Sequence, residues 1–134
     1  MFKLIRILHS GVNVPEPCRL PVTAETAYKA GSALKLTSGK ADNCGATDAP
    51  AYIAAETLAA DKKTTVLAYP ITGGMLFETA VSAAPTALTI GSKVTLNVSG
   101  SAAVGVTATA TNGVATIVDL CGAAAAGDKV IVKF

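Results

Sequence analysis

The chain contains one histidine, His9, with Ser10 next to it and Glu16 a few residues further on. A histidine, a hydroxyl and a carboxylate are the residue types of an activated nucleophile with its general base. Such groups catalyse only when they are held within hydrogen-bond reach of one another. The proline- and glycine-rich sequence around them is a poor scaffold for that geometry. We therefore interpret His9 as a surface residue, and we expect no catalytic residues and no enzyme.

Metal and cofactor sites are not indicated either. The spacing of the cysteines does not fit the paired pattern of zinc ligands: Cys18, Cys44 and Cys121. Carboxylates in the expected loops, such as Asp42, Asp48 and Asp61, lack the spacing of a calcium-binding loop. The glycines do not have the spacing of a phosphate-binding loop. We expect no metal, no cofactor and three reduced thiols that pack as small side chains.

The composition is that of one globular domain with an unusually neutral surface. The 134 residues are 51% hydrophobic, 15% charged and 4% aromatic, with a net charge of +2. Charged residues make up about a quarter of ordinary domains. The dispersed Lys and Arg residues disfavour a nucleic-acid partner, and no window of about 20 residues is free enough of charges and helix breakers to span a membrane. Arg6 interrupts the apolar run that an export signal needs, so we expect a protein made in the cytoplasm.

Short runs of alternating or β-branched residues, separated by Gly, Pro and Asn, predict an all-β fold with about eight short strands. This spacing is typical of a compact β-barrel or sandwich, and alternation alone does not distinguish the two. The segments expected to form strands are 2–8, 33–37, 50–54, 64–69, 75–81, 93–98, 106–111, 114–118 and 129–134.

The last third of the chain has the clearest pattern. Asn112-Gly113 lies between two β-rich runs and predicts a hairpin with a two-residue type I′ turn, because both turn positions need φ > 0. Alternation in this region also predicts which side chains point inward. They are Val94, Leu96, Val98, Ile117, Val130 and Val132.

Residues 1–24 differ from the rest of the chain, because several prolines follow the apolar N-terminal run. Proline fixes φ and favours extended neighbours, so we predict an extended arm over 1–24 and a β domain over 25–134. The apolar tip of the arm is a candidate for binding a partner through Phe2, Leu4, Ile5 and Ile7. Equally, this tip could be an edge strand of the same domain.

A series of short segments within residues 26–134 has the order and spacing of a known family. The segments are AYKAGSALKL at 27–36, AYIA at 51–54, VLAYPI at 66–71, MLFET at 75–79, LTIGSKVTL at 88–96 and AGDKVIVKF at 126–134. This series resembles the small head decoration, or capsid cement, proteins of tailed bacteriophages. The proline-rich residues 1–24 lie outside the resemblance.

The resemblance implies a β-barrel-like domain that binds the outside of an icosahedral head and stabilises the mature capsid. It further implies a homotrimer on the virion surface, with the major capsid protein as partner. In this interpretation the arm reaches over a neighbouring capsid subunit and adds a strand or an apolar plug.

A carbohydrate-binding β-sandwich module of a surface or tail-fibre protein is the alternative function. Sugar sites usually contain stacked Trp or Tyr rings, and the chain has no Trp. Its tyrosines, Tyr28, Tyr52 and Tyr69, fall within or beside expected strands, where packing is the usual role.

Overall fold

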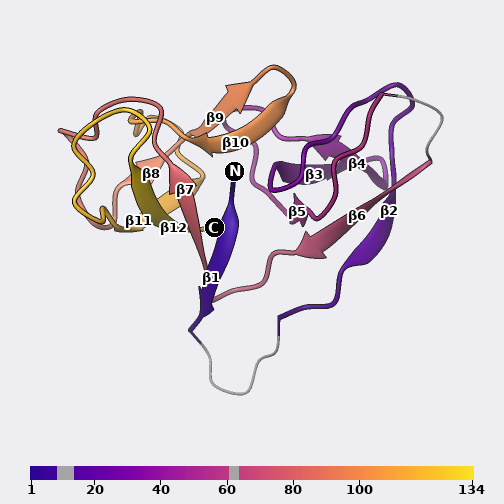
Figure 1. The fold of residues 1–134 in the computed structure, drawn as a ribbon, viewed down its shortest axis with the longest axis horizontal. Helices are drawn as coiled ribbons and strands as arrows, with labels where there is room; N and C mark the ends of the chain where they lie inside the picture. Colours follow the sequence, from indigo (N-terminus) through magenta and orange to yellow (C-terminus); the bar gives the residue numbers. More distant parts are fainter. Residues whose placement is uncertain (9–13, 61–63) are drawn as a thin grey trace.

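The computed structural model describes residues 1–8, 14–60 and 64–134 (Figure 1). Within these ranges the chain forms twelve β-strands and no helix, and so contains no helix that could cross a membrane. The strands are β1 (Lys3–Ile7), β2 (Cys18–Pro21), β3 (Ala33–Thr37), β4 (Lys40–Asn43), β5 (Tyr52–Ala54), β6 (Thr65–Pro70), β7 (Met75–Ala80), β8 (Lys93–Val94), β9 (Leu96–Ser99), β10 (Ala102–Val106), β11 (Ala115–Asp119) and β12 (Lys129–Lys133).

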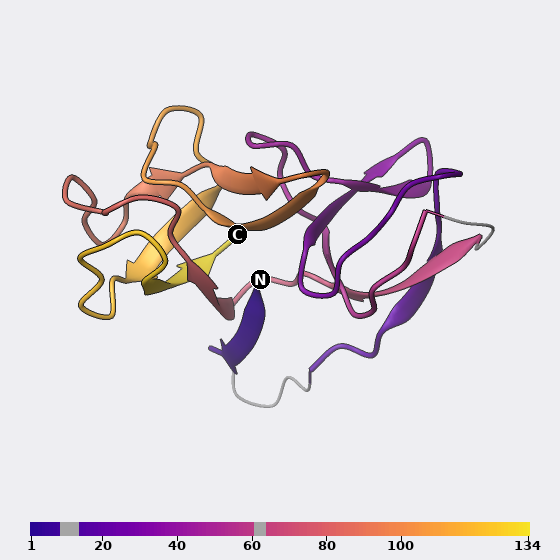
Figure 2. The ribbon, with the colours of Figure 1, turned by 45° about the horizontal axis from the view of Figure 1, so that its top comes forward.

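The strands form two antiparallel sheets, which confirms the all-β prediction. A five-stranded sheet has the order β1-β7-β12-β11-β8. A seven-stranded sheet has the order β2-β6-β5-β3-β10-β9, with β4 paired to β3. In the described part of the chain, each sheet has unpaired edge strands, so the architecture is sandwich-like and not a closed barrel. Figures 1 and 2 show the two sheets on opposite sides of the molecule, with both chain termini between them.

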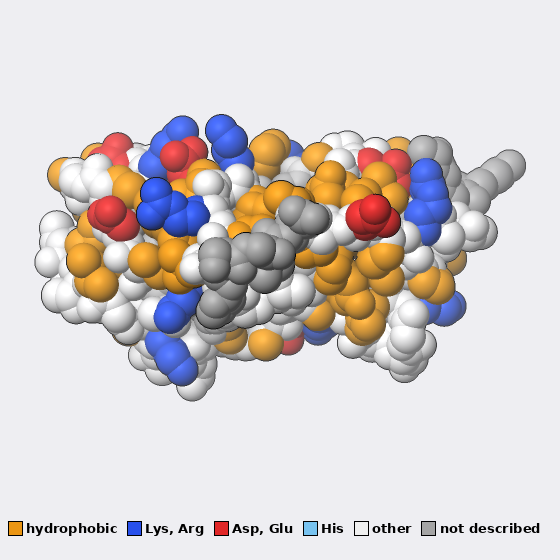
Figure 3. Space-filling model, turned by 90° about the horizontal axis from the view of Figure 1, so that it is seen from below, with side chains coloured by type: hydrophobic (Ala, Val, Ile, Leu, Met, Phe, Trp, Pro, Cys, Tyr) orange, Lys and Arg blue, Asp and Glu red, His pale blue; other side chains and the backbone are white. Residues whose placement is uncertain are grey.

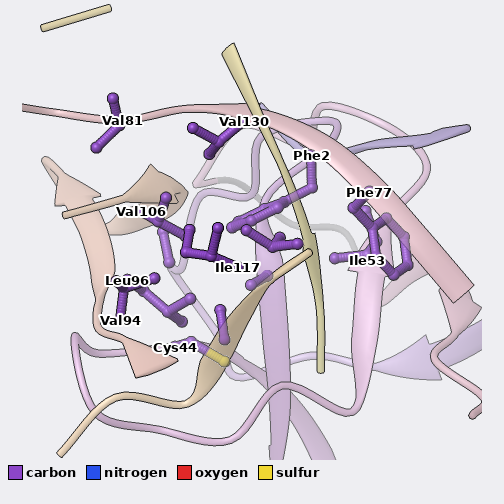
Figure 4. Packing of buried hydrophobic residues seen from close by; sticks show 14 of the residues in the cluster. Phe2, Cys44, Ile53, Phe77, Val81, Val94, Leu96, Val106, Ile117 and Val130 are labelled. Atoms are coloured by element: carbon purple, nitrogen blue, oxygen red, sulfur yellow. The ribbon is translucent and has the colours of Figure 1, made fainter. Parts of the chain in front are cut away.

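The main core lies where the two sheets face each other. The five-stranded sheet contributes Phe77, Ile117 and Val132, and the seven-stranded sheet contributes Ile53 and Leu96. Figure 4 shows side chains from both sheets converging on this core. Each fully buried side chain of this size contributes about 1.5–3 kcal/mol relative to an exposed one, so the core is the main force that holds the sheets together.

A second core lies on the opposite face of the seven-stranded sheet. Successive residues of a strand point to opposite faces, so Ala33 packs in the main core and Leu34 in the second one. A parallel bridge between Val22 and Ala41 curls the sheet around this second core. The buried Tyr28 closes it, and its hydroxyl donates a hydrogen bond of 2.7 Å to the carbonyl of Ala41.

The predicted strand at 93–98 is divided between the two sheets. Its first part, β8, pairs with β11 in the five-stranded sheet, and its second part, β9, pairs with β10 in the seven-stranded sheet. Thr95 lies at the division, is only 6% exposed, and its hydroxyl is 2.6 Å from that of Thr107. One segment therefore joins both sheets.

The predicted hairpin of 106–111 with 114–118 is wrong. β10 and β11 pair not with each other but with successive parts of 93–99, and residues 107–114 bulge out opposite Thr95. Only Asn112 has the positive φ, 56°, that a type I′ turn would need at both positions. Gly113 is instead required for close packing, because a Cβ atom there would lie 2.4 Å from the backbone nitrogen of Val94.

The inward-facing prediction holds for five of its residues and fails for Val98. Val94, Leu96, Ile117, Val130 and Val132 are buried, whereas Val98 is 39% exposed. Val98 pairs with Ala103 and therefore faces the same side of the sheet as the core. It lies on β9, the edge strand, beyond the part of the sheet that is covered.

The segment 1–24 contributes one strand to each sheet. β1 pairs with β7 at the edge of the five-stranded sheet, as in the edge-strand alternative, and β2 pairs with β6 in the seven-stranded sheet. Phe2 is only 3% exposed and belongs to the main core. His9 and Ser10 lie outside the described residues.

The close packing at Gly113 predicts a large effect of a single methyl group. We expect Gly113→Ala to lower the free energy of unfolding by about 1–3 kcal/mol, because the Lys93–Val94 backbone would have to move. Gly73→Ala is the matched control, since no atom lies within 4 Å of its Cβ position, and it should change stability by less than about 0.5 kcal/mol. Urea unfolding of both variants checks this, and equal midpoints would contradict it.

Candidate functional site

A groove of about 480 Å³ lies between β1 of the five-stranded sheet and the β5–β6 region of the seven-stranded sheet. Its lining is mainly apolar and includes Leu4, Val14, Ile53, Tyr69 and Phe77. Figure 3, a view from below Figure 1, shows hydrophobic side chains on several parts of this face, including a group to the right of the centre. The volume is within the range of about 300–1,000 Å³ that is common for binding pockets.

Aromatic packing fixes the floor of the groove. The ring of Phe134, after β12, lies 5.3 Å from the ring of Phe2 and 5.5 Å from that of Phe77, measured between centroids. The first of these pairs is edge-to-face, a favoured arrangement of aromatic rings. Phe2 and Phe77 are both buried, so this part of the groove is rigid.

Backbone hydrogen bonds tie the start of β1 to the other sheet. The amide of Phe2 donates to the carbonyl of Gly31 over 2.8 Å, and the amino group of Met1 donates to the carbonyl of Val104. The amide of Leu8 donates to Gly74 over 2.8 Å at the other end of the strand. β1 is therefore anchored at both ends, and its side chains have fixed positions beside the groove.

The four residues predicted to bind a partner occupy different environments. Phe2 is buried, and Leu4 and Ile7 are half-buried against the main core. Ile5 is 41% exposed because a β-bulge falls between Leu4 and Arg6, which leaves Ile5 without a partner on β7. Ile5 is thus the most exposed of the four.

Sequence reasoning did not propose three further exposed apolar side chains, one directly after β1 and two in the lining of the groove. Leu8 follows β1 and is 55% exposed, Val14 lines the groove and is 56% exposed, and Tyr69 lines it from β6 and is 38% exposed. For Val14 the sequence offered one signal, because this apolar residue lies between a polar residue and a proline. Tyr69 gave no such signal, because its strand pattern indicates packing.

Charged residues of both signs flank the groove. Lys3 lines it and Arg6 follows on the same strand, whereas Lys29, Glu16 and Glu56 are next to the lining residues Ala30, Pro15 and Ala55. Among the residues that the structure describes, none of these three cations forms an ion pair. Nearby, Lys129 is paired with Glu78 over 2.7 Å, and this hydrogen bond lowers the pKa of Glu78 from its ordinary value.

The cysteines lie outside the groove. Cys44 is buried after β4, and its burial, followed by the negative charge of Asp48, raises the pKa of the thiol to about 12. Asp48 itself accepts hydrogen bonds from Lys35 over 2.8 Å and from the amide of Gly45 over 2.7 Å. Cys18 is half-buried in β2, and Cys121 is exposed. A thiol with a raised pKa is a weak nucleophile, so Cys44 acts as a packing residue.

The remaining predicted residues are separated in space or lie outside the description. The described ranges contain no group of three or more potential metal ligands. Asp42 lies within strand β4, opposite Lys35, and not in a loop as predicted, whereas Asp61 is not among the described residues. Tyr28 is buried and Tyr52 half-buried, so Tyr69 is the most exposed of the tyrosines.

Comparison of the chain with protein-family models, with curated protein sequences and with solved structures found no match.

The buried Cys44 thiol predicts a loss of stability at alkaline pH. Its folded-state pKa, about 12, is above the ordinary value of 9.0, so the protonated thiol stabilises the fold below pH 9 and this contribution is lost as the pH rises towards 12. Burial also raises the pKa of Tyr28, which acts in the same direction. Urea unfolding at pH 8 and at pH 11 should show a smaller fall in stability for Cys44→Ala than for the wild type.

Cys18→Ala is the control for this measurement, since it removes a half-buried thiol from β2. It should keep the wild-type fall between the two pH values. An equal fall in Cys44→Ala and the wild type would contradict the assignment.

Proposed function

We propose that this protein is a structural head decoration protein of a tailed bacteriophage, which binds the outer capsid surface through the face that contains the groove. The sequence resemblance over residues 26–134 supports the proposal, together with the all-β architecture that it implies. The major capsid protein is the partner, and the decoration protein sits as a homotrimer on the virion. Its role is to stabilise neighbouring capsid subunits, without a catalytic step.

The observation that carries the proposal is a set of exposed apolar side chains: Ile5 on β1, Leu8 directly after it, and Val14 and Tyr69 in the lining of the groove. The chain as a whole has only 15% charged residues, and the cores of protein interfaces are depleted in charge. Contacts repeated around a symmetric shell combine through effective concentration, so each contact can be weak.

In this proposal β1 contributes to binding as a fixed strand of the fold and not as a mobile arm. Phe2 is part of the main core, so deletion of residues 1–10 would damage the fold as well as the binding face. The exposed side chains of the same strand can be changed without removing the anchor. Substitution of Ile5 and Leu8 therefore separates binding from folding.

A carbohydrate-binding module is the second candidate, and one observation favours it. The ring of Tyr69 is exposed in the groove next to Pro70, where a sugar ring could stack on it. Sugar sites commonly use more than one aromatic ring, and Tyr28 is buried. A titration with soluble sugars and a glycan array test this candidate directly.

Co-sedimentation with undecorated mature heads of the source phage tests the proposed function. The wild-type protein should pellet with the heads and saturate at a fixed ratio to the major capsid protein. The double variant Ile5→Asp/Leu8→Asp should bind about tenfold more weakly, because two exposed apolar contacts become charged.

Ile90→Asp is the matched control, since Ile90 is an exposed apolar residue in the loop before β8, at the opposite edge of the five-stranded sheet. It should bind as the wild type does, and all variants should have similar melting temperatures. If the wild-type protein stays in the supernatant while the heads pellet, the decoration function is wrong and the sugar-binding module takes its place.

A further inference from the structure

β1 leaves one edge of the five-stranded sheet open. Within the described residues, β1 pairs only with β7 and ends the order of its sheet. An edge strand presents backbone N–H and C=O groups that can pair with another extended chain. The bulge at Ile5 interrupts the strand, so backbone pairing is confined to short stretches. A ligand that pairs here needs additional contacts from its side chains.

The groove beside this edge can supply those contacts. Leu4 of β1 lines it on one side, and Tyr69 and Pro70 line it on the other. The side chains of Ile53 and Phe77 are buried at its floor. An added strand has alternate side chains on each face, so every second residue of a segment paired to β1 can enter the groove. Apolar residues at those positions would fit the lining.

The charge around the edge selects the kind of segment. Lys3 and Arg6 lie on β1 without an ion pair among the described residues. Lys3 is opposite Glu78 in the pairing with β7, but that carboxylate is already paired with Lys129, so cations are in excess at this edge. A second copy of β1 would bring its own cations against these, and like charges on paired strands are destabilising. An acidic segment would place carboxylates there instead. The charge therefore disfavours self-association through this edge and favours an acidic partner.

We propose that the β1 edge and the adjoining groove bind an extended segment of the partner protein in which apolar and acidic residues alternate. The apolar residues enter the groove, the carboxylates lie near Lys3 and Arg6, and the backbone adds a strand to the five-stranded sheet. The source of the segment, a capsid subunit, rests on the proposed function. The recognition itself depends only on the groove and the edge.

A model peptide tests the recognition without phage heads. The probe is a fluorescein-labelled, capped peptide of alternating glutamate and valine, titrated with the full chain and followed by fluorescence polarisation. The comparison peptide has lysine in place of each glutamate. We expect saturable binding of the acidic peptide, at least about tenfold tighter than that of the lysine peptide, and weaker binding at high salt.

Two pairs of variants locate the site. Lys3→Glu/Arg6→Glu reverses the charge on β1, and Lys93→Glu changes a cation on β8, at the opposite edge of the same sheet. Tyr69→Asp changes the groove, and Val98→Asp is its control. Tyr69 and Val98 are 38% and 39% exposed and lie at the two ends of one cross-strand row of the seven-stranded sheet. The first variant of each pair should weaken binding of the acidic peptide about tenfold, and the second should not change it.

Equal binding of the two peptides, or equal binding by each variant and its control, would overturn the inference. Binding to heads is measured separately by co-sedimentation. A protein that pellets with heads but does not bind the acidic peptide retains the decoration function and loses this mode of recognition. A protein that binds the acidic peptide at this site but does not pellet retains the recognition site and loses the capsid as its target.

Discussion

The arrangement of the two sheets depends on the hydrogen bonding of one segment, residues 93–99. Its first residues pair with β11 and its last residues with β10, so each sheet takes part of the same backbone. The hydrogen bond between the buried Thr95 and the half-buried Thr107 lies at the point of division. A buried hydroxyl without a partner would cost about 1–3 kcal/mol, so this pair stabilises the change of sheet as well as satisfying two polar groups. The segment therefore holds one side of the two sheets together next to the main core.

The groove forms where the main core ends. The row from Val98 through Ala103, Ala33 and Ile53 to Tyr69 is buried in its middle and exposed at both ends. At the Tyr69 end, β1 and the aromatic rings of Phe2, Phe77 and Phe134 form the opposite side and leave an apolar hollow. The same packing that buries Phe2 therefore places the open edge of β1 beside the exposed ring of Tyr69.

Local patterns predicted the strands well and their partners poorly. Residues 33–37 and 75–80 form strands as alternation and β-branching indicate, because these preferences act over a few neighbouring residues. The Asn112-Gly113 hairpin failed because the pairing of β10 and β11 with 93–99 decides the geometry of that loop. The groove could not be predicted, since it brings together residues 4, 53, 69 and 77 from separate strands. Of the four residues proposed from sequence, only Ile5 is exposed, at 41%. Its exposure follows from a β-bulge, which an alternating sequence pattern does not reveal.

The contact between Phe2 and Phe134 has a consequence for the order of folding. The second core uses only residues between 20 and 68, so it can form from one contiguous stretch of chain. The floor of the groove requires residues 2 and 134 to meet, which is the most non-local contact of the fold. Closing a long loop costs entropy before its contacts are gained, and non-local pairing slows folding. We therefore expect the groove to be completed last, since a chain that has folded only its second core lacks the residues that line it.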